Sequence, residues 1–339
     1  MRAPAALAVL LLLSGHAARA VETIRPFPFD KTCKLQDDGV VYTVEGRVRI
    51  PRGVEVTVFH GSTIRAKGPK PAVIEVEGGL DVVGVFDKEV PIEDVVIEPC
   101  ATFESIRLVT TIFHGTGGLR TREGVPANGK LRVELTDFMK PTTVDLVFGG
   151  GYVDLMTSCF DLPVKLRGVD PSPTKGNSLR LGVRNCNQYG YACKGHLGRQ
   201  GLRKGLSIEN ADEIVVSGCN IGGESLVIKD WGSKLTFDMN KVATDLLDIR
   251  NSEAGRMAKV QFTKSDIGSA QVNVYAPPAP GMKDHLTMDR CWFRGITDGK
   301  EILRKIIRDG DDLPEANGSR VVIVKPAAEP VEIAGKAPK

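Results

Sequence analysis

An eight-residue outline recurs along this chain, and it constrains the fold more than any other feature. The segments IVVSGCNI (214–221) and LTMDRCWF (286–293) share it. In both, apolar and other residues alternate, two small or polar residues follow, and a cysteine and an apolar residue come after them. Alternation of this kind is typical of a β-strand with one buried face. The recurrence predicts that the chain is built from repeats.

The outline gives one apolar anchor position for each repeat. The anchors are Leu108, Leu135, Met156, Val183, Val216, Phe237, Phe262 and Met288. A repeat of roughly 20–30 residues with one dominant strand cannot bury its apolar side alone, so successive repeats must stack into a solenoid. The L-x-x-L-x-L ladder of leucine-rich repeats and the 3.6-residue apolar spacing of helical repeats are both absent from these segments.

Stacking places a column of mostly small residues three positions after the anchors. Its expected members are Thr111, Phe138, Cys159, Cys186, Cys219, Asn240, Ser265 and Cys291. We expect the column to point inward, with cysteine acting as a small apolar residue, so that Cys159, Cys219 and Cys291 are reduced and buried. A disulfide framework is the alternative, with Cys186 and Cys193 as the first candidate pair. However, seven cysteines is an odd number, and a chain of this size does not need disulfides to fold.

Two segments carry a resemblance to a known group of proteins. Residues 42–99 run from an apolar strand through a turn marked by proline and glycine to a second strand ending in GSTI and then to VEGGLDVVG. Residues 291–326 contain an aromatic-glycine turn, a short helix, the segment IRDGDD and a final strand. Both resemble exported right-handed parallel β-helix proteins of the pectin-lyase-like superfamily. The resemblance implies an all-β fold, a single-stranded right-handed parallel β-helix (solenoid) with a short C-terminal capping helix. It implies no particular activity, because that superfamily holds lyases, hydrolases, esterases and adhesins.

The two ends of the chain predict segments outside the solenoid. Residues 1–20 have an early arginine, an apolar run and a small-residue end, which is the pattern of a secretory signal peptide. We expect an N-terminal cap or lead-in over 21–43, the parallel β-helix over 44–296, a C-terminal cap (helix plus strand) over 297–326 and a disordered tail over 327–339. The capping helix would cover the last coil with an apolar stripe of Ile302, Leu303, Ile306 and Ile307. A basic helix that binds a partner is the alternative.

Composition and motifs limit the partners and the chemistry. The chain has 45 basic and 42 acidic residues, so its charge does not predict nucleic-acid binding. No apolar stretch approaches roughly 18 residues, so we expect no membrane span. The signal-peptide pattern predicts an exported protein, in the periplasm, at the cell surface or outside the cell. The spacing of Cys186, Cys193 and His196 is not a usual zinc pattern, and we expect no metal and no cofactor. The oligomeric state stays open.

Motifs of the enzymes in this superfamily are incomplete in this chain. Its hydrolases have paired aspartates on adjacent coils with G-H-G and R-x-K motifs, because glycoside cleavage needs two positioned carboxylates. This chain has GHL at 195–197, and its Asp-Asp pairs lie in the flanking regions at 37–38 and 311–312. No compact lyase signature of calcium-binding carboxylates with a basic residue is present either. We therefore assign no catalytic residue.

The longest interval between anchors holds the loop RNCNQYGYACKGHLGRQGLRKG, residues 184–205, which has no acidic residue. Its candidate ligand-binding residues are Arg184, Tyr189, Tyr191, Lys194, His196, Arg199, Arg203 and Lys204. Tyrosine rings stack on sugars, and cations bind carboxylates or sulfates. The loop thus predicts a non-catalytic binding or scaffolding protein whose ligand is an acidic polysaccharide; a solvated loop without a ligand is one alternative. A polysaccharide lyase that acts on uronate polymers, with a Lys or Arg of this loop as base, is the other.

Overall fold

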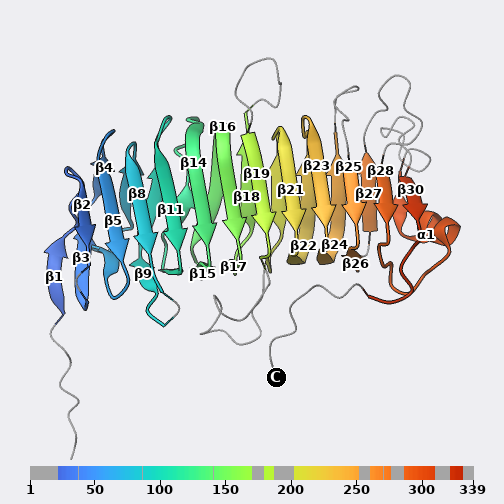
Figure 1. The fold of residues 1–339 in the computed structure, drawn as a ribbon, viewed down its shortest axis with the longest axis horizontal. Coiled ribbons are helices and arrows are strands. Elements are labelled where there is room, and N and C mark those ends of the chain that lie inside the picture. The colour runs from blue at the N-terminus through green and yellow to red at the C-terminus, as the bar shows by residue number, and fades with distance from the viewer. Residues whose placement is uncertain are drawn as a thin grey trace, which may run out of the picture.

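The computed structural model describes residues 22–36, 38–85, 87–139, 141–169, 179–186, 202–251, 260–269, 271–275, 286–309 and 321–330. These residues form a parallel β-solenoid of about nine turns, with one short helix near the C-terminal end (Figure 1). The predicted all-β fold, a single-stranded parallel β-helix with a short C-terminal helix, is confirmed. The predicted signal peptide lies outside the described residues.

Three stacks of parallel strands form the walls of the solenoid, which we call faces A, B and C. Face A contains β4 (Arg47–Ile50), β7 (Ala72–Val76), β10 (Val95–Pro99), β13 (Gly118–Arg120), the first part of β16 (Thr143–Met156), β18 (Val164–Gly168), β20 (Leu206–Glu209), the last parts of β22 (Asn220–Lys229) and β24 (Lys241–Arg250), β27 (Gln271–Tyr275) and β29 (Ile307–Arg308).

Face B faces the viewer in Figure 1. It contains β2 (Cys33–Leu35), β5 (Glu55–Phe59), β8 (Gly79–Val83), β11 (Ser105–Val109), β14 (Ala127–Glu134), the second part of β16, β19 (Leu179–Arg184), β21 (Glu213–Ser217), β23 (Lys234–Asp238), β25 (Val260–Thr263), β28 (Leu286–Asp289) and β30 (Val321–Val324). Face C contains β1 (Thr23–Pro26), β3 (Val40–Val44), β6 (Thr63–Ala66), β9 (Val90–Glu93), β12 (Thr111–His114), β15 (Asp137–Phe138), β17 (Cys159–Phe160), the first parts of β22 and β24, and β26 (Asp266–Ile267).

The inward column of face B is fully buried and confirms most of the predicted anchors. Its members are Val58, Val82, Leu108, Val133, Leu155, Val183, Val216, Phe237, Phe262 and Met288. The predicted anchors Leu135 and Met156 are wrong, because Val133 and Leu155 hold those places. Leu135 lies beyond the end of β14 and has φ of 51°, so it is a turn residue and not a strand residue.

A single residue with positive φ turns the chain from face B to face C in successive coils. These turn residues are Thr110, Leu135, Thr157, Asn185, Gly218, Met239, Lys264 and Arg290. The residue after each of them forms a buried column: Thr111, Thr136, Ser158, Cys186, Cys219, Asn240, Ser265 and Cys291. Phe138 and Cys159 were expected in this column and do not belong to it. The same shift of register that misplaced the two anchors causes this error.

Hydrogen bonds run along this column from coil to coil. The hydroxyl oxygens of Thr111 and Thr136 lie 3.0 Å apart. The side-chain oxygen of Asn240 accepts from the backbone N–H of Cys219 at 2.9 Å, and the hydroxyl of Ser265 accepts from the backbone N–H of Asn240 at 3.2 Å. Cysteine therefore recurs because the position requires a small side chain that tolerates buried polar neighbours.

The described cysteines differ in redox state. Cys219 and Cys291 are free and buried, as predicted. Cys159 is disulfide-bonded, so its predicted reduced state is wrong. Phe160 points into the core, and side chains alternate along a strand, so Cys159 in the same strand points away from the core. The candidate pairing of Cys186 with Cys193 is also wrong, because Cys186 is a free thiol.

Aromatic rings continue the stacking inside face C. The rings of Phe113 and Phe138 are stacked at 4.7 Å, and those of Phe138 and Phe160 at 5.0 Å. These separations match the spacing of about 4.8 Å between neighbouring strands, so each ring sits directly over the next. The regular coil height in this part of the solenoid therefore also sets the positions of the outward side chains.

The helix α1 (Gly299–Lys305) closes the C-terminal end of the solenoid (Figure 1). Asp298 is its N-cap, and its carboxylate accepts from the backbone N–H of Lys300 at 2.9 Å. Ile302 and Ile306 are buried against the core, and Leu303 packs beside them. Ile307, which was expected in the helix, is buried in β29. The predicted cap is confirmed, because the helix covers the core at the end of the last coils.

Candidate functional site

A groove crosses face A between β4 and β18. It consists of two neighbouring hollows of about 240 and 830 Å³, and Glu98 and Arg122 line both of them. Two connections between face A and face B form its rim, residues 100–104 and residues 120–126, and the second begins at Arg120, the last residue of β13. The second is held by Thr121, whose hydroxyl accepts from the backbone N–H of Val147 at 2.9 Å. The rim therefore stands on the strands of face A at a fixed position.

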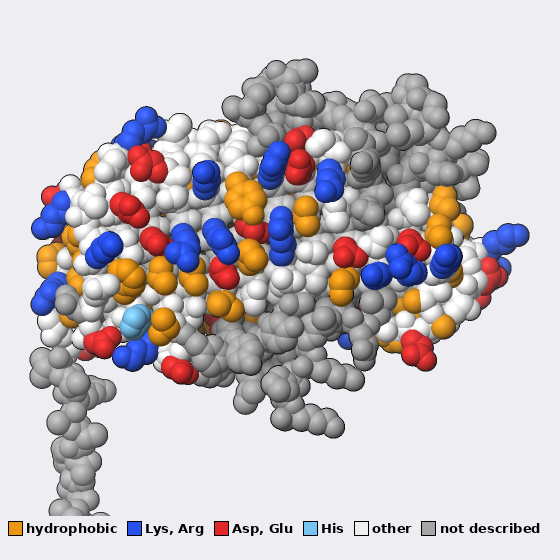
Figure 2. All heavy atoms as spheres, in the orientation of Figure 1, with side chains coloured by type: hydrophobic (Ala, Val, Ile, Leu, Met, Phe, Trp, Pro, Cys, Tyr) orange, Lys and Arg blue, Asp and Glu red, His pale blue; other side chains and the backbone are white. Residues whose placement is uncertain are grey.

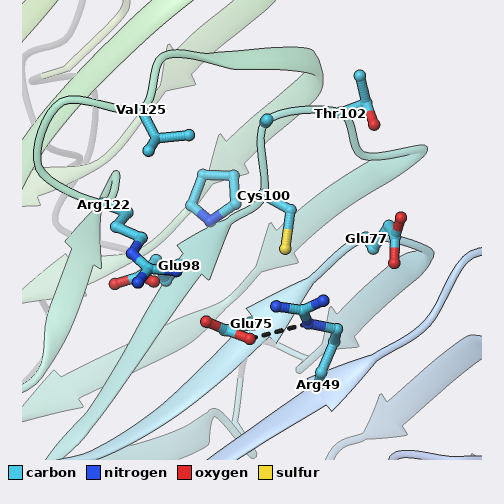
Figure 3. Close-up of a pocket in the computed structure, with 10 residues that line it drawn as sticks. Arg49, Glu75, Glu77, Glu98, Cys100, Thr102, Arg122 and Val125 are labelled. Atoms are coloured by element: carbon cyan, nitrogen blue, oxygen red, sulfur yellow. Dashed lines mark hydrogen bonds and ion pairs between the residues drawn. The ribbon is translucent and has the colours of Figure 1, made fainter.

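Two buried carboxylates form the floor of the groove. Glu75 on β7 and Glu98 on β10 are opposite each other in register, and they are 6% and 4% exposed. Like charges in this arrangement repel each other. Arg47 offsets the repulsion, because its Nη1 lies 2.6 Å from one carboxylate oxygen of Glu75 and 2.7 Å from one of Glu98. Arg49 donates to the other oxygen of Glu75 at 2.9 Å (Figure 3).

The two arginines on the floor determine the protonation state of Glu75. Burial raises the pKa of this carboxyl, but hydrogen bonds from Arg49 and Arg47 outweigh burial, so the pKa of Glu75 lies below its usual value. The hydrogen bond to Glu98 raises the pKa of Arg47, and the bond to Glu75 raises that of Arg49. Glu75 is thus ionised near neutral pH, and the two guanidinium groups hold their protons. None of these three groups can exchange a proton with a ligand near neutral pH.

Two arginines on the rim differ from those on the floor. Arg120 and Arg122 are exposed, and neither has an ion-pair partner among the residues that the structure describes. Nearby, Arg167 donates to Asp145 at 2.9 Å. Figure 3 shows the side chain of Arg122 over the hollow, on the same side as Glu98. The rim thus offers guanidinium groups with free donors above a floor whose charges are already paired.

One thiol lines the smaller hollow. Cys100 follows β10 and is a free, partly buried cysteine (Figure 3). Burial raises its pKa, Arg49 lowers it and the neighbouring carboxylates raise it, and the net shift is upward. Since the thiolate is the reactive form, Cys100 is a poor nucleophile near neutral pH.

The structure describes only three of the eight candidate residues of the 184–205 loop. Arg184 ends β19 on face B, and its Nε lies 3.7 Å from Asp154. Arg203 and the exposed Lys204 follow Leu202, which pairs with Phe160 and Ile221 of face C. These three cations therefore belong to two different faces. Tyr189, Tyr191, Lys194, His196 and Arg199 lie outside the described residues.

Sequence reasoning missed the groove because its residues come from separate coils. Glu75 and Glu98 are adjacent in space but one coil apart in the chain, whereas the Asp-Asp pairs at 37–38 and 311–312 are adjacent in sequence. The outline that revealed the repeats belongs to face B and gives no register for face A. The alternation of Arg47 and Arg49 with apolar residues, in RVRIP, is the signal that could have identified an outward cationic edge.

Within the described ranges, no group of three His, Cys, Asp or Glu side chains is placed to hold a metal ion. No helix in the described part of the chain is both long enough and apolar enough to cross a membrane. Comparison with protein-family models, with curated proteins and with solved structures gives no match.

Proposed function

We propose that this protein is an exported, non-catalytic binding protein that holds an acidic polysaccharide in the groove of face A, at the cell surface or in the periplasm. The observation that carries the proposal is the pair of rim arginines, Arg120 and Arg122, which have no ion-pair partner in the described part of the chain. A guanidinium has five donors in a planar fork that matches the two oxygens of a carboxylate.

The chemistry of the floor favours binding over catalysis. Glycoside hydrolysis needs one carboxyl group that keeps its proton near neutral pH, and the pKa of Glu75 is shifted in the opposite direction. An elimination reaction needs a base, and the pKa values of Arg47 and Arg49 are raised by their carboxylate partners. The groove is therefore suited to recognise charge and hydroxyl groups without transferring a proton.

Calorimetric titration of the full chain with uronate oligosaccharides tests the proposal. We expect binding that weakens as salt rises past roughly 0.15 M, because the rim arginines are exposed and their attraction is screened. The double variant Arg120→Ala/Arg122→Ala should bind at least about tenfold more weakly, since a charge-assisted hydrogen bond contributes about 1.5–3 kcal/mol.

The matched control removes the same charge from another face. Arg107→Ala/Arg180→Ala lies on face B, which Figure 2 shows as a surface where basic and acidic side chains interleave. It should bind like the unchanged chain. Equal binding by the rim variant, or no binding of any uronate oligosaccharide, would refute the proposed site. Release of an unsaturated product that absorbs ultraviolet light would identify a lyase instead.

The loop at 184–205 is a separate proposal for the same ligand class. Arg199→Ala/Lys204→Ala removes two of its candidate cations and leaves the groove intact. Weaker binding by this variant, with normal binding by the rim variant, would move the site from the groove to the loop.

A further inference from the structure

Charges on the outward side of face A alternate from coil to coil over five strands. Arg120 on β13 is opposite Asp145 on β16, and Asp145 is opposite Lys165 on β18. Arg167, also on β18, is opposite Glu209 on β20, which is opposite Lys229 on β22. Basic strands therefore alternate with acidic strands, and the basic ones are β13, β18 and β22.

The basic side chains dominate the outer surface of these five strands. Their outward charged residues are the cations Arg120, Lys165, Arg167 and Lys229 and the carboxylates Asp145 and Glu209. In both ion pairs the carboxylate is the more buried partner: Asp145 is 34% exposed against 45% for Arg167, and Glu209 is 29% exposed against 35% for Lys229. The cations therefore present a larger exposed fraction to a ligand on this surface than their carboxylate partners do.

The spacing of the basic strands sets the distance between charges that a polymer bound along this face has to match. Neighbouring strands are about 4.8 Å apart, so basic strands recur about every 10 Å along the solenoid axis. This is about the length of two pyranose rings in an extended chain. A polymer with a carboxylate on every second sugar can place all of its charges over basic strands. A polymer with a carboxylate on every sugar places half of them beside Asp145 or Glu209, where like charges repel.

We infer that face A from β13 to β22 is a binding strip for a linear polysaccharide that carries one carboxylate per disaccharide. This inference rests on the proposed function, because the groove rim supplies the first basic strand of the strip. It goes further by naming the charge period of the polymer, and the alternation of acidic and basic strands supplies the selectivity.

Fluorescence anisotropy with two labelled probes of equal length tests the inference. The first probe is a hyaluronan oligosaccharide, which has one carboxylate per disaccharide, and the second is an oligogalacturonate, which has one on each sugar. Both are long enough to span the five strands. We expect the full chain to bind the hyaluronan probe at least about tenfold more tightly, a difference of about 1.4 kcal/mol, although it carries half the charge. Unselective attraction gives the opposite order, so equal or tighter binding of oligogalacturonate overturns the inference and leaves the proposed function standing.

Two other outcomes overturn the inference in different ways. If neither probe binds, both the proposed function and the inference fail. If single-stranded DNA, whose phosphates are closely spaced, binds more tightly than either glycan, the strip recognises charge density and not charge period.

Variants on the basic strands and on the acidic strands distinguish recognition of the polymer's charge period from recognition of its total charge. Lys165→Ala/Lys229→Ala should weaken binding of the hyaluronan probe by about tenfold or more. Asp145→Asn/Glu209→Gln removes the acidic strands, so it should strengthen binding of the oligogalacturonate probe more than that of the hyaluronan probe. The control Asp81→Asn/Glu213→Gln makes the same charge change on face B, and its melting temperature and probe binding should follow those of the unchanged chain. If the acidic-strand variant improves both probes equally, the strip has no selectivity and the inference is wrong.

Discussion

Glu75 and Glu98 lie opposite each other on adjacent coils, and a single nitrogen atom of Arg47 bonds to both carboxylates. Both carboxylates are buried, and like charges repel each other at this separation. The arrangement therefore depends on the positive charge of Arg47. This relationship links the groove to the stability of the first coils.

Replacement of Arg47 should therefore destabilise the protein. We expect Arg47→Ala to lower the free energy of unfolding by about 2 kcal/mol at pH 7, less than for a fully buried pair, because the arginine is itself half-exposed. The pKa of Glu75 is lowered in the folded chain, so its stabilising effect is present above its unfolded pKa and is lost as the pH falls through its folded pKa. The destabilisation caused by Arg47→Ala should accordingly be smaller in acid.

Urea unfolding at pH 7 and pH 3 measures this destabilisation. The control Arg107→Ala breaks an exposed ion pair with Asp81 and should change the free energy of unfolding by less than about 1 kcal/mol. A loss in Arg47→Ala that is the same at both pH values would contradict this account.

Asp137 should make the protein more stable in mild acid than in mild base. Burial, and then the charge of Glu89, raises the pKa of Asp137 to about 8, and one of its carboxyl oxygens has no hydrogen-bond partner within the described residues. Its folded pKa is above its unfolded pKa, so the stability it contributes is complete below about pH 4 and is lost as the pH rises to about 8. Asp137→Asn removes this loss and should raise the melting temperature by several degrees at pH 8 and little at pH 4. Thermal scans across this range test the sign, with the exposed Glu45→Gln as a control that should show no such trend.

Thiol labelling should follow burial. Burial raises the pKa of Cys219 well above its usual value and that of Cys291 to about 11, so both thiols should stay unlabelled in the native protein. The partly buried Cys33 and Cys100 should react first, and Cys186, Cys219 and Cys291 only after denaturation. Cys159 should need a reductant as well. Peptide mass spectrometry after stepwise alkylation reads out this order, and rapid native labelling of Cys219 would exclude the buried column.

Asn240 should be the most sensitive position of the buried column. Its side chain accepts from the N–H of Cys219 and donates to the carbonyl of Val216 at 2.9 Å, so Asn240→Ala leaves two buried backbone groups unpaired. We expect a loss of about 2–4 kcal/mol in the free energy of unfolding. Asn240→Ser should recover part of it, since serine occupies the same column at Ser158 and Ser265. Chemical denaturation of the two variants measures the difference, and equal loss would mean that volume, not hydrogen bonding, governs the site.

The fold could be predicted from the sequence because one face repeats with little variation. The anchors from Val183 to Met288 were identified correctly, since apolar alternation and the small residue after the turn recur together. The register slipped at Leu135 and Met156, where apolar residues continue through or beside the turn and hydrophobicity no longer marks the end of the strand. The groove could not be predicted, because the contact of Arg47 with Glu98 depends on how many residues each coil uses. The number of residues per coil varies, so the contact between Arg47 and Glu98 follows only from the backbone register in the structure.

The one-residue turn between face B and face C also has a consequence for how such a chain can change in length. Coils that differ in length keep this turn, because its left-handed residue and the buried residue after it bond to the coils on either side. Between face A and face B the number of residues that separate consecutive strands varies from two, between β7 and β8, to twelve, between β29 and β30. A foreign peptide inserted between these two faces, for instance in the 121–126 connection, should leave the solenoid folded and display the insert beside the groove. One residue inserted at Lys264 should instead break the stack. The connections between face A and face B are therefore positions where the solenoid can display an inserted segment, whereas the turn residue between face B and face C fixes the register of its coil.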